Sequence, residues 1–416
     1  MAAVGIMTIA WGTQRTFGVF LEPILKEFGW TRAAVSASFT LSMLIMGSLS
    51  IFSGKLADRF GPRWVVIGCG LCLGTSYILT SRLQTLTQFY IFYGVLGGIG
   101  LSGMYAPMMS LAVRWFVKRR AFVSGILVAG PQLGIAMTPL ISSYLISLVG
   151  WRGSYWILGI LVTTVIISAS FFLRREPAEM GLLPYGAGEP QRREILSGTP
   201  GFTFAEAFRT GPFWMMNLVS FCDHFMANTL VVHIVIHARD LGIPTTAAAS
   251  ILSVGAAVSI PGRILMGGVA DRIGNRLALL ICLGTAILAF SILLLATRLG
   301  TLYLFAVLFG ISLWATVGIL SPLMAELFGL KAHATLFAFC VFAGSLGSAI
   351  GPVFTGYLFD VTGSYRLAFL LCLALSCISF GAIFLIRPLE GAKRVFGNSQ
   401  GKNFTDRMNE ISGDRR

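Results

Sequence analysis

The chain has 416 residues, of which 56% are hydrophobic and only 12% are charged. A soluble protein carries about a quarter of its residues as Asp, Glu, Lys or Arg, roughly twice the share found here. This composition excludes a set of water-soluble domains and indicates a membrane protein that crosses the bilayer many times. The net charge of +14 does not indicate a nucleic-acid partner, because topology alone concentrates Lys and Arg in the cytoplasmic loops of membrane proteins.

Repeated apolar segments are long enough to cross a bilayer. A hydrocarbon core about 30 Å thick requires about 20 helical residues. By this criterion the sequence predicts an all-α membrane protein with twelve spanning helices, at approximately residues 2–21, 33–54, 64–81, 86–112, 121–147, 151–173, 212–237, 246–270, 277–297, 301–325, 333–358 and 366–386.

The longest internal polar stretch, residues 174–211, divides these segments into six and six. We expect two six-helix bundles, residues 1–173 and 212–386, joined by this stretch as a cytoplasmic loop and followed by a cytoplasmic tail at 387–416. Of the 31 Lys and Arg residues, 22 lie in the loops after even-numbered segments and in the tail, and 7 lie in the other loops. This asymmetry places both termini in the cytoplasm. The short loops favour a bacterial inner membrane.

The two halves resemble each other at one fixed offset. GKLADRFGPR at residues 54–63 returns as GGVADRIGNR at residues 267–276, so that identical residues recur 213 positions later. A six-helix unit duplicated in parallel is the arrangement that places a binding site between two rocking halves near the middle of the membrane.

The repeated G-x-x-x-D-R-x-G-x-R loop resembles the signature of the major facilitator superfamily, and the resemblance covers essentially the whole chain. Within that superfamily, RWFVKRRAFVSGILVAG at residues 114–130 and GTQRTFGVFLEPI at residues 12–24 resemble monocarboxylate transporters, with bacterial oxalate and formate exchangers as near relatives. The acidic, Trp-rich motif that usually opens the first helix of monocarboxylate transporters is missing. The resemblance implies a secondary transporter of two parallel-repeat bundles.

The repeated loop places acidic and basic residues at the cytoplasmic ends of the second and eighth helices. Such a cluster can hold the two halves together on the inside and release them when the carrier turns inward. The alternative is a topology anchor with no other role. The candidates for this cytoplasmic gate are Asp58, Arg59, Arg63, Asp271, Arg272 and Arg276.

Arg263 lies about eight residues, or around 12 Å, from the cytoplasmic end of its helix. A guanidinium group at that depth is costly unless it is paired or wetted, and its planar fork fits a carboxylate. The alternative is a side chain that extends to the cytoplasm. The resemblance implies that Arg263 holds the substrate carboxylate. Many relatives have an Asp one turn earlier, where this chain has Ser259.

Asp223 is the deep acidic residue of the seventh helix, and its depth differs from that of Arg263 by about 4.5 Å. We expect the two to meet, so that protonation of Asp223 frees Arg263 to accept an anion and the anion crosses together with a proton. The alternative is that Asn217 or Ser220 satisfies Asp223 locally.

The seventh helix also carries His224 and His233, which lie on opposite sides of an unbroken helix at about 100° per residue. Monocarboxylate-like bacterial carriers often have a His that matches His233. We therefore expect His233 to contact substrate or to carry protons; the alternative is a hydrogen-bonded structural histidine.

Other polar and aromatic residues lie at similar depths. Arg15 near the outer end of the first helix can attract anions into an outward-open mouth, or extend to the surface. Tyr105, Gln132 and Trp314 are candidates for substrate contact, although core packing is a role open to each, and Trp11 lies at a similar depth.

The sequence thus predicts a secondary transporter of small organic anions, with proton-coupled symport of a monocarboxylate such as lactate as the leading hypothesis. The alternative is an exchanger of the oxalate and formate type, for which fixed cations suffice. A cationic drug antiporter and a transporter-like sensor are less favoured, because Arg263 repels cations and the tail is short. Four His without an H-E-x-x-H motif argue against an enzyme, and we expect no metal and no cofactor because the seven Cys lie in apolar stretches and no G-x-x-x-x-G-K-[ST] motif is present.

Overall fold

A computed structural model describes residues 1–187 and 201–386. The predicted tail at 387–416 and part of the predicted central loop, residues 188–200, lie outside the described residues. Within the described helices, the side chain of Trp314 also lies outside what the structure describes.

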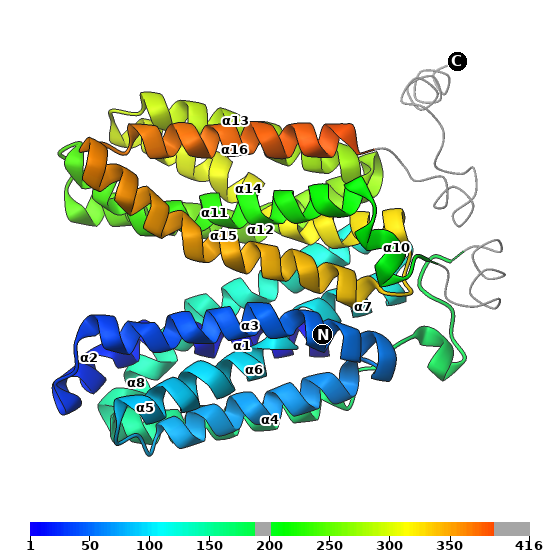
Figure 1. The fold of residues 1–416 in the computed structure, drawn as a ribbon, viewed down its shortest axis with the longest axis horizontal. Coiled ribbons are helices and arrows are strands. Elements are labelled where there is room, and N and C mark those ends of the chain that lie inside the picture. The colour runs from blue at the N-terminus through cyan, green and yellow to red at the C-terminus, as the bar shows by residue number, and fades with distance from the viewer. Residues whose placement is uncertain (188–200, 387–416) are drawn as a thin grey trace.

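Helices make up nearly all of the described chain (Figure 1). The first half contains α1 (Ala2–Arg15), α2 (Phe17–Phe28), α3 (Arg32–Phe60), α4 (Pro62–Thr80), α5 (Leu86–Phe89), the π-helix η1 (Tyr90–Leu96), α6 (Gly97–Ser102), α7 (Ala106–Trp115) and α8 (Arg120–Ser170). The connecting region contains η2 (Pro177–Met180) and α10 (Phe204–Phe208). The second half contains α11 (Gly211–Asp240), α12 (Thr245–Ile273), α13 (Asn275–Leu295), α14 (Leu299–Phe328), α15 (His333–Thr362) and α16 (Arg366–Leu385).

The predicted all-α membrane fold is confirmed. Within the described residues, ten helical stretches are long and apolar enough to cross a membrane. One of them, α8, contains two predicted segments, which meet at Gly150 with φ of 70°. An L-residue with a side chain rarely adopts this conformation, so glycine allows the chain to turn there. The first predicted segment corresponds to α1 and α2, which are separated at Thr16. The helix α2 continues beyond the predicted end of that segment.

The fourth predicted segment is less regular than expected. Its helix passes through η1 and then stops at Gly103, before α7 starts at Ala106. Pro107 in the first turn of α7 has no N–H, so it fits a helix start better than a helix interior. Apolar length predicted the span but not this interruption, which places Tyr105 at the beginning of α7.

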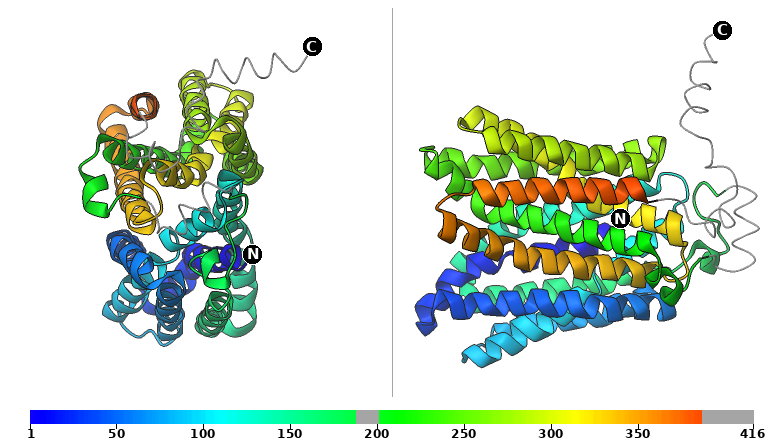
Figure 2. Two further views of the ribbon diagram at one scale, coloured as in Figure 1. Left: turned by 90° about the vertical axis from the view of Figure 1, so that its right-hand side faces the viewer. Right: turned by 45° about the horizontal axis from the view of Figure 1, so that its top comes forward.

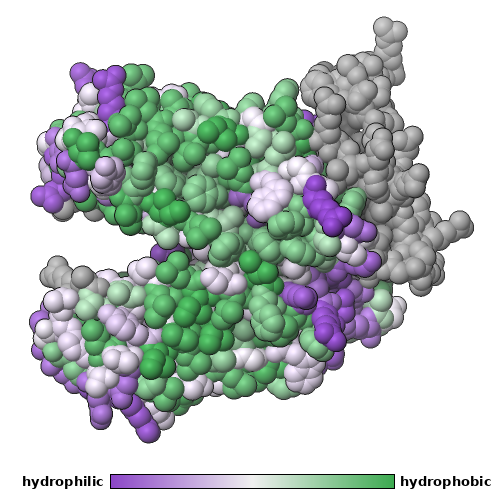
Figure 3. Space-filling model, in the orientation of Figure 1, coloured by the Kyte–Doolittle hydropathy of each residue, from purple (hydrophilic) through white to green (hydrophobic). Residues whose placement is uncertain are grey.

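The helices form two groups, α1 to α8 and α11 to α16, which lie side by side in all the ribbon views (Figures 1 and 2). On the face shown in Figure 3, a broad apolar band covers the middle and hydrophilic residues gather at the ends. A deep hollow separates the two groups at one end, which we call the open end. We call the other the closed end, where the two groups are in contact (Figure 3). The helix α3 runs to this end and finishes there at Phe60 (Figure 1).

Small residues allow close helix packing inside each group. A Cβ atom added at Gly134 of α8 would lie 2.0 Å from the carbonyl oxygen of Thr8 in α1, and Gly12 lies against the same place. Any larger residue would force α1 and α8 apart, as is typical of glycine-mediated contacts between membrane helices.

Candidate functional site

A cavity of about 580 Å³ lies between the two groups of helices. Its walls come from both halves, mainly α1, α3 and α8 on one side and α11, α12, α14 and α15 on the other. Most of the lining side chains are apolar. This volume is in the range of small-molecule binding sites.

The charged residues of the cavity wall are cationic. Arg15 and Arg263 line it together with His224, and no Asp or Glu is among the described lining residues. Low-dielectric walls strengthen the field of such charges and concentrate anions between them. The cavity therefore favours an anion over a cation.

Arg263 of α12 is only 2% exposed, and its Nη1 donates a hydrogen bond to the carbonyl oxygen of Val128 in α8 at 2.5 Å. The two helices approach closely here, because a Cβ atom at Gly125 would lie 2.5 Å from the carbonyl oxygen of Arg263. Arg263 also interacts electrostatically with Tyr105 and Asp223. The guanidinium group thus lies where the two halves meet.

Asp223 is 1% exposed and is not part of the described cavity wall. Its Oδ2 lies 4.0 Å from Nδ1 of His224. Thr316 and Arg263 contribute to its electrostatic environment, and the pairing of Asp223 with Arg263 stays a prediction. The neighbours considered as alternatives bond elsewhere: Asn217 donates to the carbonyl oxygen of Phe213, and Ser220 donates to that of Cys340.

The two histidines of α11 lie on opposite sides of the helix, as expected, but His224 lines the cavity and His233 does not. His233 is buried, with Nε2 2.9 Å from the carbonyl oxygen of Pro352 and Nδ1 3.2 Å from the hydroxyl of Tyr365. The helical period fixes the angle between two side chains but not the rotation of the helix. The expectation for His233 came from the resemblance to bacterial carriers, and the structure has His233 on the buried side of α11.

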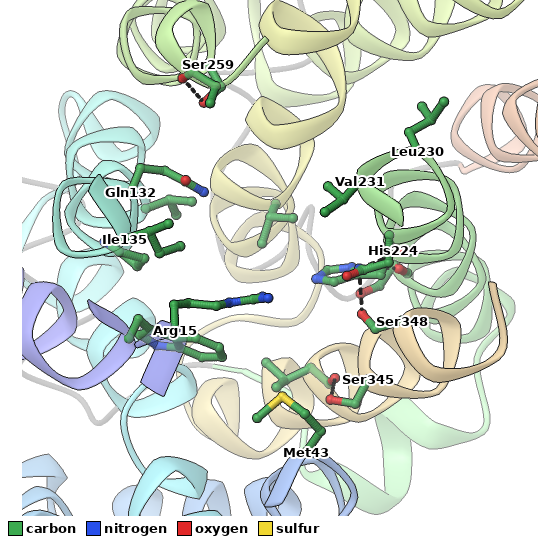
Figure 4. Close-up of a pocket in the computed structure, with 18 of the residues that line it drawn as sticks. Arg15, Met43, Gln132, Ile135, His224, Leu230, Val231, Ser259, Ser345 and Ser348 are labelled. Carbon is green, nitrogen blue, oxygen red and sulfur yellow. Dashed lines mark hydrogen bonds between the residues drawn. The ribbon is translucent and has the colours of Figure 1, made fainter. Parts of the chain in front are cut away.

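Two further residues proposed for substrate contact also line the cavity. Tyr105 and Gln132 line the cavity, and the ring of Tyr105 lies edge-on to Trp11 at 5.9 Å and stacks on Phe337 at 6.1 Å. Arg15 and His224 point toward one another across the cavity, and Gln132 projects into it beside them (Figure 4).

The repeat offers a signal for His224 that sequence reasoning did not use. His224 lies 213 residues after Trp11, and both line the cavity. The same offset relates Arg15 to Asn228 and Gln132 to Ser345, which also line it.

The repeated aspartates join the two halves at the closed end. Asp58 of α3 accepts hydrogen bonds from the backbone N–H groups of Ala334 and Thr335, at 3.2 and 2.8 Å, and from the hydroxyl of Thr335 at 2.8 Å. These groups belong to the first turn of α15 in the other half. A carboxylate at a helix N-terminus satisfies N–H groups that lack helical partners and interacts favourably with the helix dipole.

Asp271 makes the reciprocal contact. It accepts from the backbone N–H groups of Ala121 and Phe122, both at 2.9 Å, in the first turn of α8. Donors and acceptors of the two contacts are related by the same 213-residue offset. The closed end is therefore held by a symmetric pair of capping interactions.

The arginines of the repeated loops contact their own halves instead. Arg59 lies over the ring of Phe60 at 5.1 Å, and Arg63 over that of Phe171 at 4.8 Å. Arg276 donates to the carbonyl oxygens of Ile383 and Phe384 at the end of α16, and Arg272 is exposed. Of the six predicted gate residues, the two aspartates are thus the ones with these cross-half hydrogen bonds.

Arg114, which was not predicted, also bridges the halves. It is 5% exposed; its Nη2 lies 3.3 Å from Asp58 and donates to the carbonyl oxygen of Leu330 at 2.5 Å, while Nη1 lies 2.6 Å from Glu176. In the sequence it opens a basic stretch that topology alone explains, so charge counting gave no reason to single it out.

Two helical groups around a central cavity, closed at one end and open at the other, are the arrangement typical of secondary transporters built from internal repeats. The family model described as Major Facilitator Superfamily matches residues 3–329 and also residues 216–415. The chain belongs to the Major Facilitator Superfamily, and it is a transporter rather than an enzyme.

Several curated transporters are similar in sequence to this protein over most of its length. Monocarboxylate transporter 13 of Bos taurus is 26% identical over 91% of this chain and 86% of its own. The oxalate:formate antiporter of Oxalobacter formigenes is 27% identical over 94% of this chain and 91% of its own. Monocarboxylate transporter 4 of Gallus gallus is 27% identical over 86% and 75%.

Proposed function

We propose that the protein transports small organic anions by alternating access, and that a monocarboxylate such as lactate crosses together with a proton. The observation that carries this proposal is the cavity wall, which contains Arg15 and Arg263 but no carboxylate among its described residues. The relatives, named as carriers of monocarboxylates and of oxalate and formate, support the same substrate class.

Arg263 binds the substrate carboxylate in this proposal. It lies at the meeting point of α8 and α12, and a carboxylate can accept several hydrogen bonds from a guanidinium fork. Arg15 is exposed in the cavity and draws anions in from the open end. Tyr105 and Gln132 form the wall beside them.

Asp223 supplies the proton coupling. As a carboxylate it compensates the charge of Arg263, with which it interacts. Protonation removes that compensation, and the arginine then prefers an anion. Proton and anion cross as a neutral pair, which lowers the cost of moving charge through the membrane. His233 has no part in this scheme, since it lies outside the cavity wall.

The second candidate is anion exchange. The observation that favours it is that Asp223 lies behind the wall, while the wall has Ser259 at the position where the sequence resemblance implies an acid. Two fixed cations then always require an anion before the carrier turns over.

The domain division, orientation and gate follow from the same scheme. Residues 1–173 and 212–386 move as two bundles about the cavity, and the Asp58 and Asp271 contacts hold the cytoplasmic side shut. The asymmetry of Lys and Arg supports cytoplasmic termini, and the short loops support a bacterial inner membrane. The structure then corresponds to an outward-open state.

Transport into proteoliposomes tests the proposal. Uptake of radiolabelled lactate is measured with and without an inward proton gradient, and with lactate or oxalate trapped inside. Uptake driven by the gradient alone supports symport, and uptake that requires trapped anion supports exchange. If neither condition gives uptake of lactate or oxalate, the proposed substrate class is wrong.

A further inference from the structure

The backbone partner of His224 selects one tautomer of its neutral imidazole. Its Nδ1 lies 2.9 Å from the carbonyl oxygen of Ser220, one turn earlier in α11. A carbonyl oxygen only accepts, so Nδ1 carries the hydrogen. In the neutral ring Nε2 then has a lone pair and acts as an acceptor.

The position of the ring is also fixed. A Cβ atom added at Gly344 of α15 would lie 2.8 Å from Nδ1 of His224, so only glycine leaves room for the ring at this contact. Asn228, one turn further along α11, donates to the carbonyl oxygen of His224 at 3.0 Å and to the hydroxyl of Ser348 in α15 at 2.9 Å. The ring is therefore seated between α11 and α15 and directed into the cavity (Figure 4).

The cation opposite His224 cannot distinguish one carboxylate from another. Arg15 faces His224 across the cavity and carries only donors, which any carboxylate satisfies. The imidazole acceptor requires a donor from the substrate. A hydroxyl group on the carbon next to the carboxylate supplies one, whereas formate, acetate, propionate and the oxalate dianion do not.

We propose that His224 is a specificity-determining residue that accepts a hydrogen bond from the 2-hydroxyl group of the substrate, so that the cavity prefers 2-hydroxycarboxylates to carboxylates without that group. This inference rests on the proposed anion transport and names the substrate class within it. The acceptor on α11 and the carboxylate-binding Arg263 on α12 both belong to the second half, and Arg15 faces the acceptor from the first half (Figure 4).

Lactate and propionate form a matched pair of probes, because propionate is lactate without the hydroxyl group. Binding of radiolabelled propionate to the purified full-length protein is competed with either acid at pH 8, where an ordinary imidazole is neutral. We expect lactate to bind about five-fold more tightly, which corresponds to about 1 kcal/mol at 1.4 kcal/mol per tenfold, the usual size of a neutral hydrogen bond.

Two substitutions separate the two ring nitrogens. His224→Asn places an amide nitrogen near the position of Nδ1 and removes the acceptor at Nε2, so we expect the ratio of the two affinities to fall to about one while propionate affinity is kept. His224→Gln places an amide oxygen near the position of Nε2 and should restore part of the lactate preference. Gly344→Ala displaces the ring without changing it and should also reduce the ratio.

The outcomes distinguish failure of this inference from failure of the proposed anion transport. If the wild-type protein binds both acids equally, or if all three variants keep the lactate preference, His224 does not recognise the hydroxyl group and the inference is wrong. The proposal of anion binding is unaffected by that result. If His224→Asn weakens both acids by the same factor, His224 binds anions generally and the inference is wrong. If the wild-type protein binds neither acid, the monocarboxylate function and the inference both fail.

Discussion

The reciprocal capping of helices at the closed end leads to a graded prediction. Replacing Asp58 or Asp271 by Asn removes the charge at almost constant size and turns one of the two acceptor oxygens into an NH2 group, which only donates. Asp58 accepts three hydrogen bonds from the other half and Asp271 accepts two. A charge-assisted hydrogen bond is stronger than a neutral one by about 1 kcal/mol. The closed end should therefore lose at least about 3 kcal/mol in Asp58→Asn and at least about 2 kcal/mol in Asp271→Asn.

These losses correspond to roughly 100-fold and 30-fold increases in the population of states in which the closed end is open. The assay is the rate of thiol labelling at Ala338→Cys, in a background in which the seven native cysteines are replaced. Ala338 is fully buried in α15, close to where a Cβ atom on Gly54 would lie. Because the labelling rate is proportional to the open population, the assay detects even rare opening.

The matched control is Glu179→Gln, which removes an exposed charge from the connecting region that follows α8. Its labelling rate should equal that of the parent. Unchanged rates in both aspartate variants would refute the gate, and a larger effect of Asp271→Asn than of Asp58→Asn would refute the count of hydrogen bonds on which the magnitudes depend.

Four further substitutions test the cavity and the packing around it. Arg263→Ala should weaken carboxylate binding roughly 10- to 100-fold, since a hydrogen bond to a charged group contributes about 1.5–3 kcal/mol, and retained affinity in a binding assay would remove Arg263 from the substrate role. Asp223→Asn should leave anion exchange intact and abolish uptake driven by a pH gradient in proteoliposomes; unchanged gradient-driven uptake would contradict the coupling scheme. His233→Ala should lower the thermal unfolding temperature, because two buried hydrogen bonds are lost, while the lactate to propionate ratio stays at the parent value. At the open end, the hydrogen bond from Arg152 lowers the pKa of Glu27. The stabilisation from this pair is therefore fully present above the ordinary pKa of a glutamate. It is lost as the pH falls through the lowered pKa of Glu27. The pair is about 40% exposed, so Glu27→Gln should cost at most about 1 kcal/mol at pH 7 and still less below pH 4, as measured by thermal unfolding at both pH values.

The sequence predicted the parts of the fold that depend on apolar length. A membrane-spanning segment must satisfy its backbone hydrogen bonds within its own helix. About twenty consecutive apolar residues are therefore sufficient to predict a spanning helix. Local exceptions were not predictable by this route: the helix stops at Gly103, and α3 continues to Phe60, past the charged Lys55 at which the hydropathy criterion ended it. Backbone hydrogen bonding continues through charged residues that lie in water, so hydropathy underestimates helix length.

Site residues could be predicted from the sequence where depth in the membrane and charge are enough to identify them. Arg263 and Arg15 are cations at places where few residues tolerate a charge, and both line the cavity. The choice between His224 and His233 was not decided by depth, because it requires the rotation of α11 about its own axis. Arg114 was missed for another reason: its partners, Asp58 and Leu330, come from distant parts of the chain, and only the folded structure brings them together.

The internal repeat has different consequences at the two levels of the molecule. At the closed end the offset of 213 residues relates identical residues, Asp58 to Asp271, and each makes the same kind of contact with the opposite half. In the cavity the same offset relates one lining position to another with different chemistry, such as Trp11 to His224 and Arg15 to Asn228.

This difference follows from what each level must recognise. The closed end joins two similar bundles, so a two-fold arrangement satisfies both with one motif. A small organic anion has a charged end and an uncharged remainder, and a symmetric wall would offer both the same groups. Placing the guanidinium of Arg15 on the first half and the acceptor of His224 on the second gives the cavity a polarity that matches such a molecule. Divergence of the two halves at cavity positions, with identity kept at the gate, is therefore what substrate orientation requires of a duplicated carrier.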